Sequence, residues 1–272
     1  MRRLLGIGDN TADIYVSHGT MYPGGNAVNV AVLSARLGHA ASYVGCVGDD
    51  AAGNMILQAL RLEGVDLSRC RQVAGTTSWS RIEHRERDRF FVGSSAGVQG
   101  QWTLTEDDLS FAAEHRIVHT SIYSDLDAEL PRLRQAAATL SYDFSSEWTE
   151  AHLERVASFV DVAFLSCDLP EAGCLELAAD VARRGTPLVV VTRGAAGSLA
   201  LHGEAVYRHG TEPANVVDTL GAGDALIAGF LNAWAEHADV AAALAAGARY
   251  AAQNCSTFGA FGHGVPLEVL RV

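Results

Sequence analysis

The residues 217–224, Val-Asp-Thr-Leu-Gly-Ala-Gly-Asp, run directly into an apolar segment with helical character. Gly221, Ala222 and Gly223 leave backbone N–H groups uncovered at the start of this predicted helix. Such amides lack intrahelical partners and lie at the positive end of the helix dipole, so they attract phosphate. Asp224, about one turn further on, can accept a proton from a hydroxyl. A base beside an anion-binding loop favours phosphoryl transfer to an alcohol. The structural alternative is a Gly-Ala-Gly turn that only lets the helix pack closely on a strand.

Candidate ligands for sugar hydroxyls follow the first predicted strand, residues 4–8. Asp9 and Asp13 come directly after it, and ligands of open α/β sheets bind beyond the carboxyl ends of strands. Carboxylates are strong acceptors for hydroxyl groups. The alternative for both residues is that they cap and turn the chain.

A second group of candidates lies at the start of the next predicted helix. Gly24 and Gly25 form a turn in which a small ligand could approach the backbone. Asn26 and Asn29 are three residues apart, so they share one face of the helix, and each amide offers a donor and an acceptor. A sugar with several hydroxyls suits this pair, whereas an ordinary Asn cap is the alternative.

The remaining chain predicts the elements that must position these residues. From residue 104 onward, apolar segments alternate in character between helix and strand, which predicts an α/β fold with a doubly wound, mostly parallel sheet. Residues 76–92 predict a hairpin with a charged tip, paired with 14–21 as a projecting flap. Predicted strands include 117–119, 140–144, 160–165 and 187–192, a hairpin covers 199–207, and predicted helices include 127–138, 170–184, 222–236 and 240–255.

Composition limits the class of protein. The 272 residues are 49% hydrophobic with only six prolines, which suits a single globular domain. A formal charge of −12 argues against nucleic-acid or anionic-membrane partners. The five cysteines are an odd set without Cys-x-x-Cys spacing, so we expect reduced thiols and neither a disulfide framework nor a zinc site. The N-terminus lacks the apolar region of a signal peptide, which predicts a cytoplasmic protein.

The motifs described above resemble those of the ribokinase (PfkB) family of sugar kinases. The resemblance rests on 218–224, on Gly-Gly-Asn-Ala-Val-Asn-Val-Ala at 24–31 and on Gly-Asp-Asp-x-x-Gly at 48–53, which together extend over nearly the whole chain. It implies one ribokinase-like kinase domain over 1–272, a three-layer fold whose mostly parallel sheet is flanked by helices, and a small β lid formed by about 13–22 and 76–98. It also implies ATP-dependent phosphorylation of a sugar hydroxyl.

The resemblance also assigns roles to individual residues. Asp224 would be the catalytic base, and the amides of Gly221, Ala222 and Gly223 would form the anion hole. The sugar would be held by Asp9, Asp13, Gly24, Gly25, Asn26 and Asn29. The nucleotide side would be formed by Thr192, Gly194, Gly197, Thr219 and Asn254.

Within the family, the chain is most similar to the fructoselysine 6-kinase subgroup. The similar segments include 8–15, 117–119 and the motif Asp143-Phe144-Ser145-x-x-Trp148. The implied reaction is transfer of the γ-phosphate of ATP to a primary hydroxyl of a fructosamine. The alternative phosphate acceptors within the same family are another ketose, a pentose or a nucleoside. A non-catalytic sugar-binding regulatory protein is the alternative of another class, and the base beside the anion hole disfavours it.

Two departures from the family pattern concern the metal and the substrate. Many members carry Asn-x-x-Glu where this chain has Asp168 and Glu171, so we expect these residues to support Mg²⁺ indirectly. The arginine found after the aspartate in some acid-sugar kinases is missing after Asp143, which argues against a carboxylated substrate. The resemblance leaves open a monovalent cation such as K⁺ and a homodimer formed through the lid.

Overall fold

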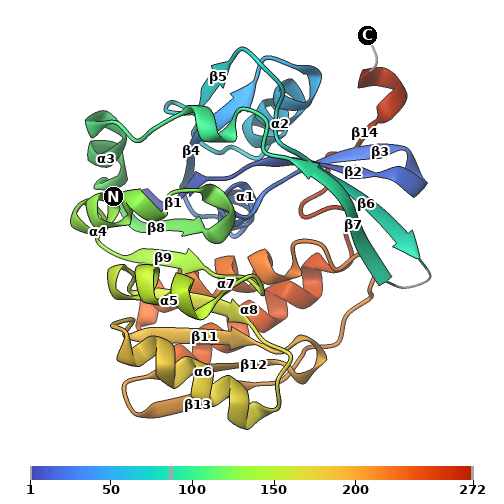
Figure 1. Cartoon of the computed structure of the whole chain (residues 1–272). Helices are drawn as coiled ribbons and strands as arrows, with labels where there is room; N and C mark the ends of the chain where they lie inside the picture. The colour runs from blue at the N-terminus through green and yellow to red at the C-terminus, as the bar shows by residue number, and fades with distance from the viewer. Residues whose placement is uncertain (1, 86–87, 271–272) are drawn as a thin grey trace.

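The computed structural model describes residues 2–85 and 88–270, and its largest element is a nine-stranded sheet (Figure 1). The strand order is β13-β12-β11-β10-β9-β8-β1-β4-β5. The strands are β1 (Arg2–Gly8), β4 (Ala41–Gly48), β5 (Arg71–Val73), β8 (His115–Ser121), β9 (Leu140–Asp143), β10 (Val162–Ser166), β11 (Leu188–Thr192), β12 (Ser198–His202) and β13 (Ala205–His209).

The seven strands β11, β10, β9, β8, β1, β4 and β5 pair with their neighbours in parallel. Strand β12 pairs antiparallel with β11 and forms an antiparallel hairpin with the edge strand β13. The central strands are runs of Val, Leu and Ile buried on both faces, as parallel sheets require. The doubly wound sheet and the hairpin over 199–207 are therefore confirmed.

Helices cover both faces of the sheet and complete three layers (Figure 1). One core cluster joins the sheet to α1, α2, α7 and α8, and the other joins it to α3, α4, α5 and α6. The helices are α1 (Asn26–Arg36), α2 (Ala51–Leu62), α3 (Glu106–Ala112), α4 (Leu130–Ala136), α5 (Glu150–Val156), α6 (Glu171–Arg183), α7 (Ala222–His237) and α8 (Val240–Asn254). Short 3₁₀ turns lie at Val16–His18, Gln99–Gln101, Ile122–Ser124, Asp127–Glu129, Ala157–Phe159, Gly194–Ala196 and Leu267–Leu270.

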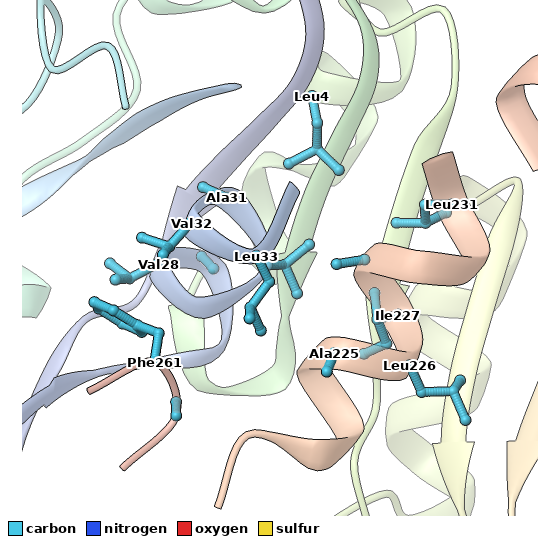
Figure 2. Packing of buried hydrophobic residues seen from close by; sticks show 14 of the residues in the cluster. Leu4, Val28, Ala31, Val32, Leu33, Ala225, Leu226, Ile227, Leu231 and Phe261 are labelled. Atoms are coloured by element: carbon cyan, nitrogen blue, oxygen red, sulfur yellow. The ribbon is translucent and has the colours of Figure 1, made fainter. Parts of the chain in front are cut away.

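Helices α1 and α7 pack against each other across the first core cluster (Figure 2). Val28 and Leu33 of α1 lie in one cluster with Ile227 of α7 and with Phe261. All four side chains are almost completely buried, and each contributes roughly 1.5–3 kcal/mol by leaving water. This packing fixes the beginnings of both helices relative to each other, although they are far apart in the sequence.

A second, five-stranded sheet projects beyond the carboxyl end of β1, a central strand of the main sheet (Figure 1). Its strand order is β14-β3-β2-β6-β7, and only β2 and β6 pair in parallel. The strands are β2 (Thr11–Tyr15), β3 (Thr20–Gly24), β6 (Trp79–Arg85), β7 (Asp88–Ser95) and β14 (Val265–Pro266). The hairpin expected within 76–92 is present as β6 and β7, while residues 86–87 at its tip lie outside the described part of the chain.

The helices and the cysteines can be compared with what the composition predicts. Within residues 2–85 and 88–270, no helix is both long enough and apolar enough to cross a bilayer. All five cysteines are free thiols, four of them buried and Cys70 half-buried. The expectation of mostly buried thiols is therefore confirmed.

Candidate active site

The carboxylate of Asp224 lies at the start of α7 and is held by two amides from α1. Asn26 Nδ2 donates to Asp224 Oδ1 at 2.7 Å, and Asn29 Nδ2 donates to Asp224 Oδ2 at 2.6 Å. Both asparagines are buried, whereas Asp224 is half-buried. The structure therefore brings together the predicted base and the predicted asparagine pair. Donors on both oxygens fix the orientation of the carboxylate.

A second carboxylate, Asp143 at the end of β9, shares the amide of Asn26. Asn26 Nδ2 donates to Asp143 Oδ2 at 2.9 Å, and the backbone N–H of Ser145 donates to Asp143 Oδ1 at 2.9 Å. Burial raises the pKa of Asp143 to about 7, opposed by the Ser145 N–H bond and assisted by the charges of Asp224 and Asp9. Sequence reasoning did not place Asp143 in the site. The signal was available, because Asp143 ends a strand at the edge where ligands bind.

Behind Asn26 lies a buried histidine that sequence reasoning also missed. His119 Nε2 is 2.9 Å from Asn26 Oδ1, and His119 Nδ1 is 3.0 Å from the Oγ of Ser141. Burial lowers the pKa of His119 to about 3, so the ring is neutral. Asp224, Asp143 and His119 are therefore joined through one amide side chain.

Asp9 lies at the N-terminus of α1, and its carboxylate is occupied by protein donors. The backbone N–H of Asn26 donates to it at 2.5 Å and that of Ala27 at 3.2 Å. Ser121 and Ser124 add hydroxyl donors at 2.9 and 2.8 Å. These contacts favour the capping alternative for Asp9 over direct binding of a sugar.

Asp13 and Gly24 face each other on neighbouring strands of the second sheet. A Cβ on Gly24 would lie 2.2 Å from Asp13 Oδ2, so only glycine leaves room for this buried carboxylate. Gly25 directly precedes α1 and has a φ of +103°. The glycine pair thus allows the chain to pass closely around Asp13 into the helix that carries the asparagines.

The loop before α7 is anchored by buried Asp218. Its carboxylate accepts hydrogen bonds from the N–H of Leu220 and the N–H of Gly259, each at 3.0 Å, and from the hydroxyl of Tyr15. Gly221 caps the helix with a φ of +78°, and a Cβ there would lie 2.6 Å from the backbone of Ala260. This left-handed, crowded position requires glycine.

The amides of this loop differ in their availability. Ala222 N–H already donates to the carbonyl of Thr219 at 3.2 Å. That leaves Gly221 and Gly223 as the better donors for an anion, and a Cβ on Gly223 would meet no atom within 4 Å. Thr219 and Gly223 are exposed, so the mouth of the loop is open to a ligand.

The predicted nucleotide residues lie on three segments: the end of β11 with the turn after it, the loop before α7 with Thr219, and the end of α8. Thr192 ends β11, and its hydroxyl is 2.9 Å from that of Ser166, while Gly194 and Gly197 belong to the turn that follows. Asn254 is buried at the end of α8, and its Nδ2 has no partner within the described residues.

A cavity of about 310 Å³ lies beside Asn254. Its walls are residues 212–215 and the last turns of α8. The N–H groups of Val217 and Asp218 donate to the carbonyl of Cys255 at 2.8 and 3.0 Å, which ties the end of α8 to the loop before α7. The lining residues on α8 and its end are Arg249, Ala252, Gln253 and Ser256.

The two candidate metal residues have different surroundings. Asp168 is exposed just before α6, whereas Glu171 forms ion pairs with Arg193 at 3.0 Å and with Arg208 at 2.7 Å. Hydrogen bonds from Arg208 lower the pKa of Glu171 most, although burial opposes them. Each oxygen of Glu171 already faces an arginine, whose positive charge disfavours direct coordination of Mg²⁺, so an indirect contact fits Glu171 better. Across residues 2–85 and 88–270, no three His, Cys, Asp or Glu side chains form a metal cluster.

Comparisons with known proteins agree with this geometry. The model of the pfkB family of carbohydrate kinases matches residues 3–265. The fructosamine kinase FrlD of Bacillus subtilis (strain 168) is 42% identical over 98% of this chain and 95% of its own. The fructoselysine 6-kinase of Escherichia coli (strain K12) is 36% identical over 96% of this chain and 100% of its own.

Solved structures show the same fold. The ribokinase of Arabidopsis thaliana, solved with ribose and ATP, has a TM-score of 0.85 at 22% identity and covers 100% of this chain and 99% of its own. The predicted ribokinase-like, three-layer α/β fold is confirmed. With the family model matching almost the whole chain, this protein belongs to the pfkB family of carbohydrate kinases.

Proposed function

We propose that this chain transfers the γ-phosphate of ATP to a primary hydroxyl of a fructosamine, a sugar of the fructoselysine type. The observation that carries the proposal is the Asp224 carboxylate, which two buried amides orient beside the N-terminus of α7. The fructosamine kinase and fructoselysine 6-kinase relatives support the acceptor. They do not favour another ketose, a pentose or a nucleoside, and the oriented base disfavours a purely sugar-binding protein.

In the proposed reaction, Asp224 accepts the proton of the sugar hydroxyl as the oxygen attacks phosphorus. Asn29 Oδ1 is buried and has no partner in the described part of the chain, so it can accept a hydrogen bond from the sugar. Asp13 supplies a further buried acceptor at the edge of the second sheet. Fixing these acceptors before the substrate arrives lowers the entropic part of the barrier.

The amides of Gly221 and Gly223 would stabilise the charge on the transferring group, because they lie at the positive end of α7. The cavity beside Asn254 suits the base of the nucleotide, which would place the phosphates toward the loop. Mg²⁺ bound with ATP would neutralise phosphate charge there, with Asp168 and Glu171 holding it through water. A requirement for a monovalent cation such as K⁺ stays a prediction.

The second sheet is proposed as a lid that closes over the sugar and also pairs two copies of the chain. Its outer strand β7 exposes three large apolar side chains in succession, Phe90, Phe91 and Val92, which are 42%, 61% and 44% exposed. A soluble monomer seldom exposes such a run on an edge strand, because edge strands pair readily with other chains.

We also propose that the protein is cytoplasmic, because its two substrates, the sugar and ATP, would both be present there.

The decisive experiment measures ADP release from ATP and Mg²⁺ by the purified chain with fructoselysine, other fructosyl amino acids, fructose, ribose and adenosine. Turnover restricted to fructosyl amines would support the proposal. Turnover on ribose or adenosine would overturn the acceptor, and silence across all sugars would overturn the kinase reaction in favour of a binding protein.

The role of Asp224 is tested with Asp224→Asn, which keeps the size of the side chain but cannot take up a proton. We expect kcat to fall by about 10²–10⁴-fold while the KM for the sugar changes by less than about threefold. If the variant turns over at the wild-type rate, Asp224 is not the base.

A further inference from the structure

The side-chain amide of Asn26 occupies a junction whose hydrogen-bond directions are all determined. Its Nδ2 faces two carboxylates, Asp224 Oδ1 and Asp143 Oδ2, at 2.7 and 2.9 Å. As the proposed base, Asp224 is ionised and only accepts, so the amide must turn its Nδ2 toward this carboxylate, and the second hydrogen of Nδ2 is donated to Asp143 Oδ2. The Oδ1 of Asn26 must therefore point away from the carboxylates, and it lies 2.9 Å from His119 Nε2.

The donor and acceptor roles on the histidine follow from this arrangement. An amide oxygen only accepts, so His119 Nε2 must carry the proton. A neutral imidazole has one donor and one acceptor, so Nδ1 then accepts from the hydroxyl of Ser141 at 3.0 Å. The ring is neutral at every working pH, because burial lowers the pKa of His119 to about 3.

The backbone holds this relay rigidly. His119 and Ser141 are direct partners in the register of parallel strands β8 and β9, and both are fully buried. Asn26 is the first residue of α1, and its own N–H donates to Asp9 at 2.5 Å. Side chains fixed at both ends in this way can transmit orientation from the core to the site.

We propose that His119 is a positioning residue for phosphoryl transfer: its Nε2–H holds the Asn26 amide with Nδ2 toward Asp224, and thereby orients the catalytic carboxylate. The inference rests on the proposed function, in which Asp224 is the base. Without the histidine donor, the Asn26 amide could rotate and present its oxygen to two carboxylates. Asp224 would then lose one of its two orienting donors and meet a repulsive oxygen.

The test compares His119→Leu with His119→Gln in the whole chain. Leucine fills the space without a donor, whereas glutamine offers an N–H of similar reach to Asn26 Oδ1. We expect His119→Leu to lower kcat by about 10- to 100-fold with little change in the KM for ATP, because a small misplacement of a reacting group is costly. His119→Gln should recover most of this loss.

The matched control is His115→Leu, on the same strand β8. His115 is equally buried, and its ring nitrogens are 2.8 Å from the Phe111 carbonyl and 2.9 Å from the Ser42 hydroxyl, so its hydrogen bonds do not involve Asn26. Each variant is assayed well below its own melting temperature. A kcat for His119→Leu equal to that of His115→Leu would overturn the proposal, as would a glutamine variant as slow as the leucine variant.

Two further outcomes separate the causes of failure. If His119→Leu does not fold, Ser141→Ala decides, because it removes the donor that fixes the His119 tautomer while leaving the ring. A kcat about threefold or more below wild type would then support the relay, and an unchanged kcat would overturn it. Wild-type protein without turnover on any sugar would instead contradict the proposed function, independently of the histidine variants.

Discussion

At the scale of single residues, the site is organised by amides placed between carboxylates. Asp224 and Asp143 both accept from Asn26 Nδ2, so two acidic groups are held within one hydrogen-bond network. Like charges this close favour protonation of one partner. The pKa of Asp143, raised to about 7 mainly by burial, identifies that partner. Asp224 accepts a hydrogen bond on each oxygen, from the amides of Asn26 and Asn29.

The raised pKa of Asp143 predicts a specific pH dependence of stability. The folded chain keeps a proton on Asp143 up to about pH 7, whereas the unfolded chain loses it near the ordinary value of 3.8. Stability from this group is therefore fully present below about pH 4 and is lost as the pH rises through about 7. In the variant Asp143→Asn, the side chain at this position stays neutral at every pH. The melting temperature of this variant, relative to that of wild type, should therefore increase as the pH rises.

Thermal unfolding of both proteins between about pH 5 and about pH 8 measures this difference. Asp125→Asn is the control, because Asp125 is exposed and its left-handed backbone, with a φ of +56°, tolerates asparagine. A difference between wild type and Asp143→Asn that stays constant with pH would contradict the raised pKa.

At the scale of elements, the site is built where helix starts meet strand ends. The N-terminus of α1 brings Asn26 and Asn29, and the N-terminus of α7 brings Asp224, and the two helices pack side by side (Figure 2). Strand β8 carries His119 two residues before its end, and strand β9 ends with Asp143. Helix starts suit an anionic substrate because of their unpaired amides and dipoles.

The turn from β3 into α1 offers a test of the sugar pocket. In Gly24→Ala, the new Cβ would lie 2.2 Å from Asp13 Oδ2, so the carboxylate must move. We expect the KM for the sugar to rise by about tenfold or more, with the KM for ATP unchanged. Steady-state kinetics with each substrate varied in turn measures both values.

Gly93→Ala in β7 of the same sheet is the matched control. A Cβ there would meet only Trp79, at 3.7 Å, which is ordinary contact. Wild-type affinity for the sugar in Gly24→Ala would mean that Asp13 does not bind it.

At the scale of the whole molecule, two sheets are joined close to the proposed site. The hydroxyl of Tyr15, in β2 of the second sheet, donates to Asp218 in the loop before α7. Asp218 also binds the loop at Gly259. A movement of the second sheet would therefore also move Asp218 and the loop before α7, as the closure of a lid over the site requires.

Pairing through the second sheet predicts the mass of the protein in solution. The wild-type chain should sediment at twice its mass of 28.8 kDa, and Phe91→Asp should sediment as a monomer because it places a charge on the exposed apolar run of β7. Analytical ultracentrifugation measures both. Val206→Asp, on the exposed edge strand β13, is the control that should leave the dimer intact. A wild-type monomer would contradict the pairing.

Local sequence patterns determined much of this protein. The α/β fold follows from alternating apolar segments, and the loop before Asp224 follows from glycines that precede an apolar helix. Asn26 and Asn29 could be paired because helical spacing places them on one face. These features depend on residues that are close in sequence, which local propensity and periodicity report.

Only the tertiary structure decided how these local pieces meet. Asn26 contacts His119 across 93 residues and Asp143 across 117, and both contacts exist because β8 lies next to β1 in the sheet and β9 lies next to β8. The same applies to Asp9, whose donors come from 17 to 115 residues away, and to Glu171, which Arg193 and Arg208 occupy. Strand order, burial and charge pairing arise from the packing of distant segments, so no local pattern could assign these partners.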